Sequence, residues 1–261
     1  MEKVRSNFFE GISINMLKVI GMITMFIDHV AVYFSYKITP EVYLICRLIG
    51  RISMPLFVFI LVQGYMHTRN LKKYMIRIGV LAIITQVLSL ILGYINKIYY
   101  PNYVNELGHL FNILFSFVLS LILIRAFDIE KKYINKFNRY INFILRLFIV
   151  ICVVIIYCYI NVDYSFTIPV MAINFFLFEK IKTKLKTEEM KTVFTGFEMI
   201  IMLIIAIVFN RMEMLVVVDV PILFLYNGKK KNKFDFNRLA MYAFFPLHHF
   251  VLYLIAMLIG G

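Results

Sequence analysis

The chain has 261 residues, 62% of them hydrophobic, and its 28 lysines and arginines against 15 acidic residues give a formal net charge of +13. Repeated apolar runs of about 18–22 residues exclude a soluble globular domain and indicate membrane-spanning helices. The runs do not alternate between polar and apolar residues, which excludes the strands of a β-barrel. Because the lysines gather between the runs, the positive charge indicates membrane topology and predicts no nucleic-acid partner.

From these runs we predict an all-α, polytopic membrane protein with about nine transmembrane helices, forming a single domain over residues 1–261. Lysine and arginine dominate every second connecting segment, beginning with the residues before the first helix. The positive-inside rule therefore places the N-terminus in the cytoplasm and the C-terminus outside. We expect a multi-pass protein of the cell membrane, in contact with membrane lipids. The predicted helices cover residues 15–36, 43–66, 73–96, 109–126, 140–161, 165–180, 193–210, 212–227 and 239–259.

The first predicted helix carries an acid and an imidazole together, Asp28 and His29, in an otherwise apolar stretch. An ionisable group at membrane depth costs about 3 kcal/mol or more, so such groups usually line a polar pathway or site. Lys18 lies about three helical turns before His29, on the same face and roughly 16 Å away along the axis. A cation at the membrane rim and a proton acceptor at depth are typical of an active site. The alternative is that Asp28 is only a structural ion-pair partner.

The second predicted helix carries two arginines at membrane depth. Arg47 and Arg51 are one turn apart and share a face, so both should point into protein or water rather than lipid. Pro55 should kink this helix, because it lacks a backbone donor. Asp28 and Arg51 are expected at similar depth, and an ion pair between them would neutralise both groups. For the arginines, that pair alone is the structural alternative to a role in a site.

A cluster of cations follows the second helix at the cytoplasmic rim, and no acidic residue interrupts it. It comprises Arg69, Lys72, Lys73 and Arg77. Two interpretations stay open from charge alone. The cluster could contact anionic lipid head groups, as juxtamembrane basic segments commonly do. It could instead hold the phosphates of a nucleotide-bearing cofactor, for which arginine is well suited.

The last predicted helix carries two adjacent histidines, His248 and His249, shortly after Pro246. Neighbouring helical residues point about 100° apart, so we expect only one of the two to face a given site, and we favour His248. A chelating pair is therefore not expected. No third ligand is apparent from the sequence, and we predict no metal site.

Several blocks of this sequence resemble the TraX family, whose named member acetylates the N-terminus of conjugative pilin. The blocks occur in the family's order across nearly the whole chain. They are Leu17–His29, Ile49–Phe59, Gly64–Arg77, Phe111–Phe115, Leu225–Lys229 and Phe244–His248. The spacing from Lys18 to His29 is also distantly similar to the first helix of the acyltransferases that modify bacterial surface polysaccharides. The lysosomal heparan glucosaminide N-acetyltransferase has a comparable transmembrane plan.

This resemblance implies an acetyl-CoA-dependent membrane acetyltransferase. The acyl group would pass from cytoplasmic acetyl-CoA to an amine or hydroxyl of an acceptor in the cell envelope, such as a peptide N-terminus, an amino sugar or a polymer. His29 would be the general base or an acyl carrier, and Asp28 or Arg51 would orient it and stabilise the oxyanion. His248 would approach the acceptor. The CoA phosphates would be held by Lys18, Arg69, Lys73 and Arg77.

A proton-coupled transporter is the alternative from a different functional class, with Asp28, His29 and His248 as a proton relay. Transporters of this kind usually contain internal repeats and helices broken at matched positions. The sequence shows neither feature, which favours the enzyme. The residues do not identify the acceptor, and they do not distinguish N- from O-transfer or acetyl from longer acyl groups.

Overall fold

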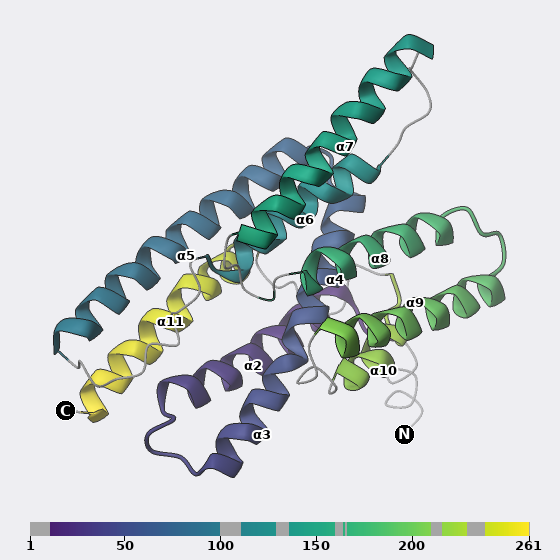
Figure 1. The fold of residues 1–261 in the computed structure, drawn as a ribbon. Helices are drawn as coiled ribbons and strands as arrows, with labels where there is room; N and C mark the ends of the chain where they lie inside the picture. Colours follow the sequence, from purple (N-terminus) through teal and green to yellow (C-terminus); the bar gives the residue numbers. More distant parts are fainter. Residues whose placement is uncertain are drawn as a thin grey trace, which may run out of the picture. The chain divides into compact units, whose positions relative to one another are not determined.

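The computed structural model describes residues 11–99, 111–128, 136–159, 164, 166–209, 216–228 and 238–260. Within these residues the chain is helical, apart from turns, connecting segments and an isolated bridge between Ile12 and Tyr226. The all-α prediction is therefore confirmed for the described part of the chain. The fold forms two compact units (Figure 1): residues 1–60 with 184–261, and residues 61–183.

The first unit contains the histidine-bearing helices. Ser13 caps α2 by accepting a hydrogen bond from the backbone of Met16, and Thr39 caps α3, whose first residue is a proline, as is common at helix starts. Both α3 and α11 pack against α2. The helices of this unit are α2 (Ile14–Tyr33), α3 (Pro40–Arg51), the start of α4 (Ser53–His67), α9 (Glu188–Phe209), α10 (Asp219–Phe224) and α11 (Arg238–Gly260).

A glycine brings α2 and α3 together. Gly50 faces the side chain of Asp28, and a Cβ atom added at Gly50 would overlap that carboxyl group. The two helices lie side by side as a hairpin (Figure 1). The contact leaves no room for a side chain at position 50 of α3. The close approach puts the acid of α2 against the arginine-bearing face of α3.

The helix that contains Pro55 is interrupted at Ile52, between α3 and α4, and the kink predicted at Pro55 stays a prediction. The α-helical hydrogen-bond ladder stops at Arg51 and resumes at Ser53, so that Pro55 lies in the first turn of α4. A proline nitrogen cannot donate to the carbonyl of residue 51, and the first turn of a helix is where that lost bond matters least. The hydroxyl of Ser53 donates to the carbonyl of Gly50 at 2.7 Å and satisfies one acceptor at the break.

The second unit is built around α6, which packs against α5, α7 and α8. Asn112 caps α6 through its side-chain oxygen and also bonds to Gln86 and to the carbonyl of Ala82 on α5. Most large side chains of α7 are apolar and exposed, as expected of a helix that faces lipid. The helices are the end of α4, α5 (Leu71–Tyr99), α6 (Ile113–Phe127), α7 (Lys136–Tyr159) and α8 (Thr167–Lys182).

Among the described residues, six helical segments are long and apolar enough to cross a membrane, so the protein is membrane-embedded. They include Pro40–His67, which joins α3 and α4. The predicted helices at 109–126 and 165–180 correspond to α6 and α8, whose 15 and 16 residues fall short of the about 20 that a perpendicular crossing needs.

The helix predicted over 212–227 is wrong in its extent. In its described part, residues 216–218 form a short 3₁₀ turn and α10 covers the six residues Asp219–Phe224, too few to cross a bilayer. Pro221 lies in the first turn of this short helix. After the helix, the backbone forms hydrogen bonds with Ile12. The backbone of Ile12 donates to Leu225 at 2.7 Å and accepts from Asn227 at 3.0 Å.

Candidate functional site

Three imidazole rings converge in the first unit, from two helices. The ring of His29 on α2 lies 4.9 Å from that of His248 and 4.4 Å from that of His249, measured between centroids. The two α11 rings are 4.2 Å apart. His248 is 5% exposed. We call these three residues the histidine cluster.

The expectation that only one of the two α11 histidines would face the site of His29 is wrong. Adjacent helical side chains do diverge, but the ring of His29 projects from α2 into the angle between them and contacts both. Helical periodicity describes only how His248 and His249 diverge on their own helix. It does not show how α2 packs against α11. The functional importance of each α11 histidine stays a prediction.

Backbone carbonyls determine the tautomers of two histidines. The Nδ1 atom of His29 lies 2.8 Å from the carbonyl oxygen of Met25, and that of His248 lies 2.6 Å from the carbonyl oxygen of Phe244. A carbonyl oxygen only accepts, so each neutral ring carries its proton on Nδ1 and presents a lone pair on Nε2. On each ring, Nε2 is therefore the nitrogen that can accept a proton or bind a metal.

Next to the cluster, Asp28 is 8% exposed and accepts a hydrogen bond of 3.1 Å from the guanidinium of Arg47. The sequence suggested Arg51, one turn further along α3, as the partner of Asp28, and that pair stays a prediction. The contact between Gly50 and Asp28 explains the role of Arg47, because it sets the register of α3 against the carboxyl group. Pairing a buried carboxylate with a guanidinium avoids the cost of an isolated charge in the membrane.

The four cations predicted to bind CoA divide between the two units. Lys18 belongs to the first unit, where its ammonium group lies 3.4 Å from the side-chain oxygen of Asn15. Arg69, Lys73 and Arg77 belong to the second, where Arg77 donates to the carbonyl of Lys73 at 3.1 Å.

A basic pocket of about 690 Å³ lies in the second unit. Arg69 lines it together with Lys72 and Arg125; Lys73 and Arg77 are not among its lining residues. Sequence reasoning missed Arg125, which is far along the chain from the cluster at 69–77. Its signal was present, however, since Arg125 and Asp128 are the charged residues that end an apolar run.

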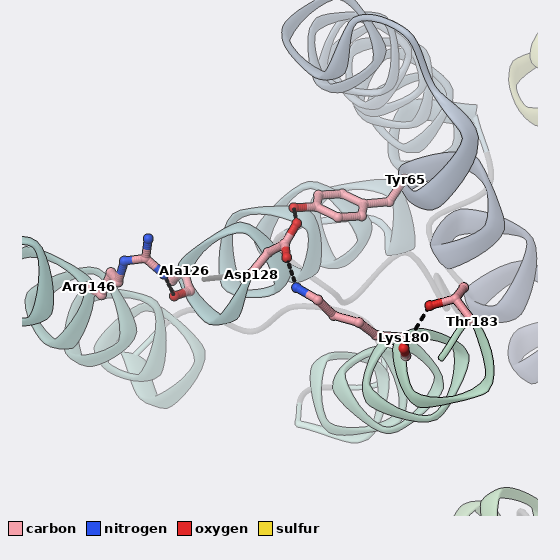
Figure 2. A network of polar contacts seen from close by, with 6 residues as sticks. All are labelled: Tyr65, Ala126, Asp128, Arg146, Lys180 and Thr183. Atoms are coloured by element: carbon pink, nitrogen blue, oxygen red, sulfur yellow. Dashed lines mark hydrogen bonds and ion pairs between the residues drawn. The ribbon is translucent and has the colours of Figure 1, made fainter. Parts of the chain in front are cut away.

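A polar network forms one wall of this pocket. Asp128 follows α6 and accepts a hydrogen bond of 2.9 Å from the Tyr65 hydroxyl of α4, and it forms an ion pair with Lys180 of α8 (Figure 2). Burial raises the pKa of Asp128, but the hydrogen bonds from Lys180 and Tyr65 outweigh burial and hold this pKa below its ordinary value. The carboxylate thus stays charged and ties three helices together.

The family model described as TraX protein matches residues 13–256. The chain belongs to the TraX family. It is also similar to "Probable fimbrial assembly protein FimC, serogroup H1" from Dichelobacter nodosus, with 40% identity over 70 residues. That alignment spans 27% of this chain and 28% of the relative's length. No solved structure matches.

All the described site features lie within the part of the chain that matches the TraX family. The histidine cluster uses residues near both ends of the matched range, and the basic pocket uses residues from its middle.

Proposed function

We propose that this TraX-family protein is a membrane acetyltransferase of the cell membrane. It moves an acetyl group from cytoplasmic acetyl-CoA to an amine or hydroxyl of a cell-envelope acceptor. The observation that carries this proposal is the imidazole of His29 inside an apolar helix, with its Nδ1 bonded to the carbonyl of Met25 and a buried ion pair one residue away. An imidazole is the side chain best suited to take up and return a proton near neutral pH.

In the proposed reaction, the acceptor nitrogen or oxygen attacks the thioester carbonyl while its proton passes to Nε2 of His29. The tetrahedral intermediate then collapses, the carbon–sulfur bond breaks, and the CoA thiolate takes the proton from His29. The carboxylate of Asp28, held by Arg47, would stabilise the imidazolium that forms in between. Arg51 would stabilise the oxyanion, and His248 would contact the acceptor. An acyl-histidine intermediate on His29 is the variant of this scheme that a single-turnover labelling experiment would detect.

The donor would bind through its phosphates on the cytoplasmic side. Lys18, Arg69, Lys73 and Arg77 are the cations proposed from the sequence, and the pocket adds Lys72 and Arg125 as candidates. Arginines that line a concave surface can bind a phosphate through two parallel hydrogen bonds. Anionic lipid head groups are the competing ligands for the same charges.

A transfer assay tests this proposal. Purified protein in lipid nanodiscs is incubated with radiolabelled acetyl-CoA and cell-envelope extract, and label is followed into the extract and into the protein. We expect His29→Ala to lower transfer at least about 100-fold, the low end of what a general base contributes. His67→Ala is the matched control, because the Nδ1 of His67 lies 2.9 Å from the carbonyl of Gln63, four residues earlier, in the same kind of local bond. A His29→Ala protein that keeps more than a tenth of wild-type transfer would reject the base role.

A proton-coupled transporter is the second candidate, and the contact of His29 with both α11 histidines favours it, because touching imidazoles can pass a proton along. Proteoliposomes loaded with a pH-sensitive dye distinguish the two functions. A transporter would move protons in a way that depends on Asp28, His29 and His248 without acetyl-CoA. The acetyltransferase would show no such flux.

A further inference from the structure

We propose that His29, His248 and His249 form a binding site for one divalent transition-metal ion of the zinc class. One nitrogen from each of the three rings can be chosen so that all three lie within 4.8 Å of one another. Zinc–nitrogen bonds are about 2.0–2.1 Å long, so three nitrogens around a tetrahedral ion lie about 3.3 Å apart. The spacing of up to 4.8 Å is about 1.5 Å wider than this, so the three rings would move together when the ion binds.

The hydrogen bonds behind the rings favour this site. His29 and His248 each donate Nδ1–H to a backbone carbonyl and therefore present Nε2 as a ligand. Histidines that bind metals usually hold their second ring nitrogen in this way, which fixes the orientation of the ring. For His249, the Tyr33 hydroxyl lies 3.2 Å from Nδ1 and can accept its proton, which leaves Nε2 as the third ligand.

A buried atom without a partner points in the same direction. The Nε2 atom of His248 is buried and has no hydrogen-bond partner among the described residues. The ring is held in place by Phe244, which stacks on it at 4.6 Å with an angle of 8° between the planes. A buried lone pair without a donor is unfavourable, and a bound cation would satisfy it.

The ligand type selects the class of metal. Three neutral imidazoles suit zinc, cobalt, nickel and copper, whereas magnesium and calcium prefer oxygen ligands. Three protein ligands leave the fourth position open for a water molecule, whereas structural zinc sites have four protein ligands. The ion would also occupy the lone pair that His29 needs as a general base. We therefore expect Zn²⁺ to inhibit acetyl transfer reversibly.

Metal binding is measured on the full chain, purified without a polyhistidine tag and freed of metal with a chelator. Competition with a chromophoric indicator should give one Zn²⁺ per chain. His29→Gln, His248→Gln and His249→Gln should each weaken binding at least tenfold, and the matched control His67→Gln should not. Cobalt provides a direct probe, since tetrahedral Co²⁺ bound to the wild type should give a visible absorption band that the three variants lose.

Two further measurements keep the outcome decisive. Thermal unfolding shows whether a variant is folded, and protection of the wild-type histidines from diethyl pyrocarbonate by Zn²⁺ requires no variant. The proposal is overturned if the wild type binds no Zn²⁺, or if folded cluster variants bind it as tightly as wild type does. It is supported if Zn²⁺ protects the wild-type histidines and the folded cluster variants lose Zn²⁺ binding.

Acetyl transfer measured over the same Zn²⁺ titration separates this inference from the proposed function. Inhibition that follows the binding curve supports both the site and the base role of His29. If the ion binds at the cluster and transfer is unchanged or faster, the metal site stands and the base role fails. If transfer depends on His29 and no ion binds, the metal site fails and the proposed function stands.

Discussion

Single residues at helix ends carry charges that the fold neutralises locally. Asp128 ends α6, where a negative charge opposes the helix dipole, and the ion pair with Lys180 offsets that opposition. The hydroxyl of Tyr65 adds a second donor to the same carboxylate. Protonation of Asp128 should therefore weaken the contacts among α4, α6 and α8.

The sign of this pH dependence follows from the lowered pKa of Asp128. A carboxyl group with a pKa below its ordinary 3.8 in the folded protein stabilises the fold above that value and loses this effect as the pH falls through the folded pKa. Asp128→Asn should lower the melting temperature at pH 7, and the difference from wild type should shrink below about pH 4. Melting curves from pH 7 to pH 3 in detergent measure it. A difference that is the same at every pH would contradict the electrostatic role.

The candidate site also shows how far single residues could be predicted. Asp28 and His29 stand out because charges are rare in an apolar helix, and the structure places both beside polar partners. The contact of Arg47 with Asp28 was not predictable, because Arg47 and Arg51 share one face and a shift of one turn along α3 leaves the sequence pattern unchanged. The register depends on the contact between Gly50 and Asp28, which periodicity does not show.

At the scale of helices, that glycine contact is testable. Gly50→Ala should destabilise the α2–α3 hairpin, because the new Cβ would overlap the carboxyl group of Asp28. Gly196→Ala on α9 is the matched control, since a Cβ there meets nothing within 4 Å and alanine favours a helix by about 0.5–1 kcal/mol. We expect a lower melting temperature for Gly50→Ala and an unchanged or higher one for Gly196→Ala. Equal melting temperatures would show that α3 shifts to accommodate the methyl group.

The basic pocket of the second unit makes a separate prediction about the donor. Arg69→Glu and Arg125→Glu should each weaken acetyl-CoA binding several-fold, and more at low salt, because exposed charges are screened. Lys186→Glu is the control, as this exposed lysine lies outside the pocket lining. Isothermal titration with acetyl-CoA and with CoA lacking its 3′-phosphate measures the effect. If both ligands bind equally to all variants, the pocket binds lipid head groups instead.

For the molecule as a whole, the helical class and the membrane location could be predicted from apolar runs, and the number of crossings could not. The run at 212–227 is apolar enough for a span, but α10 covers six residues, and beyond it Leu225 and Asn227 form backbone hydrogen bonds with Ile12. The runs at α6 and α8 did form helices, at lengths that hydropathy alone does not determine. Convergence of His29 with His248 and His249 depends on tertiary packing, which a single sequence does not reveal.

Orientation in the membrane is still a prediction, and cysteine labelling tests it. In a chain whose native cysteines (Cys46, Cys152 and Cys158) are replaced by alanine, a cysteine is introduced at Lys37 or at Lys186. With a cytoplasmic N-terminus, an impermeant maleimide added to intact cells should label position 37 and should not label position 186. Permeabilised cells are the control in which both should react. The reverse pattern would invert the topology and place the basic pocket on the outer side.

The first unit is assembled from the two ends of the chain, and this has a consequence for its biosynthesis. Tyr33 and its partner His249 are 216 positions apart, which at about 5–20 residues per second corresponds to roughly 10–40 s of translation. Arg47 is synthesised soon after Asp28, so the two can form their ion pair while translation continues. The ring neighbours of His29, His248 and His249, are synthesised only with α11. Chains that stop before α11 would thus insert into the bilayer without His248 and His249 beside His29.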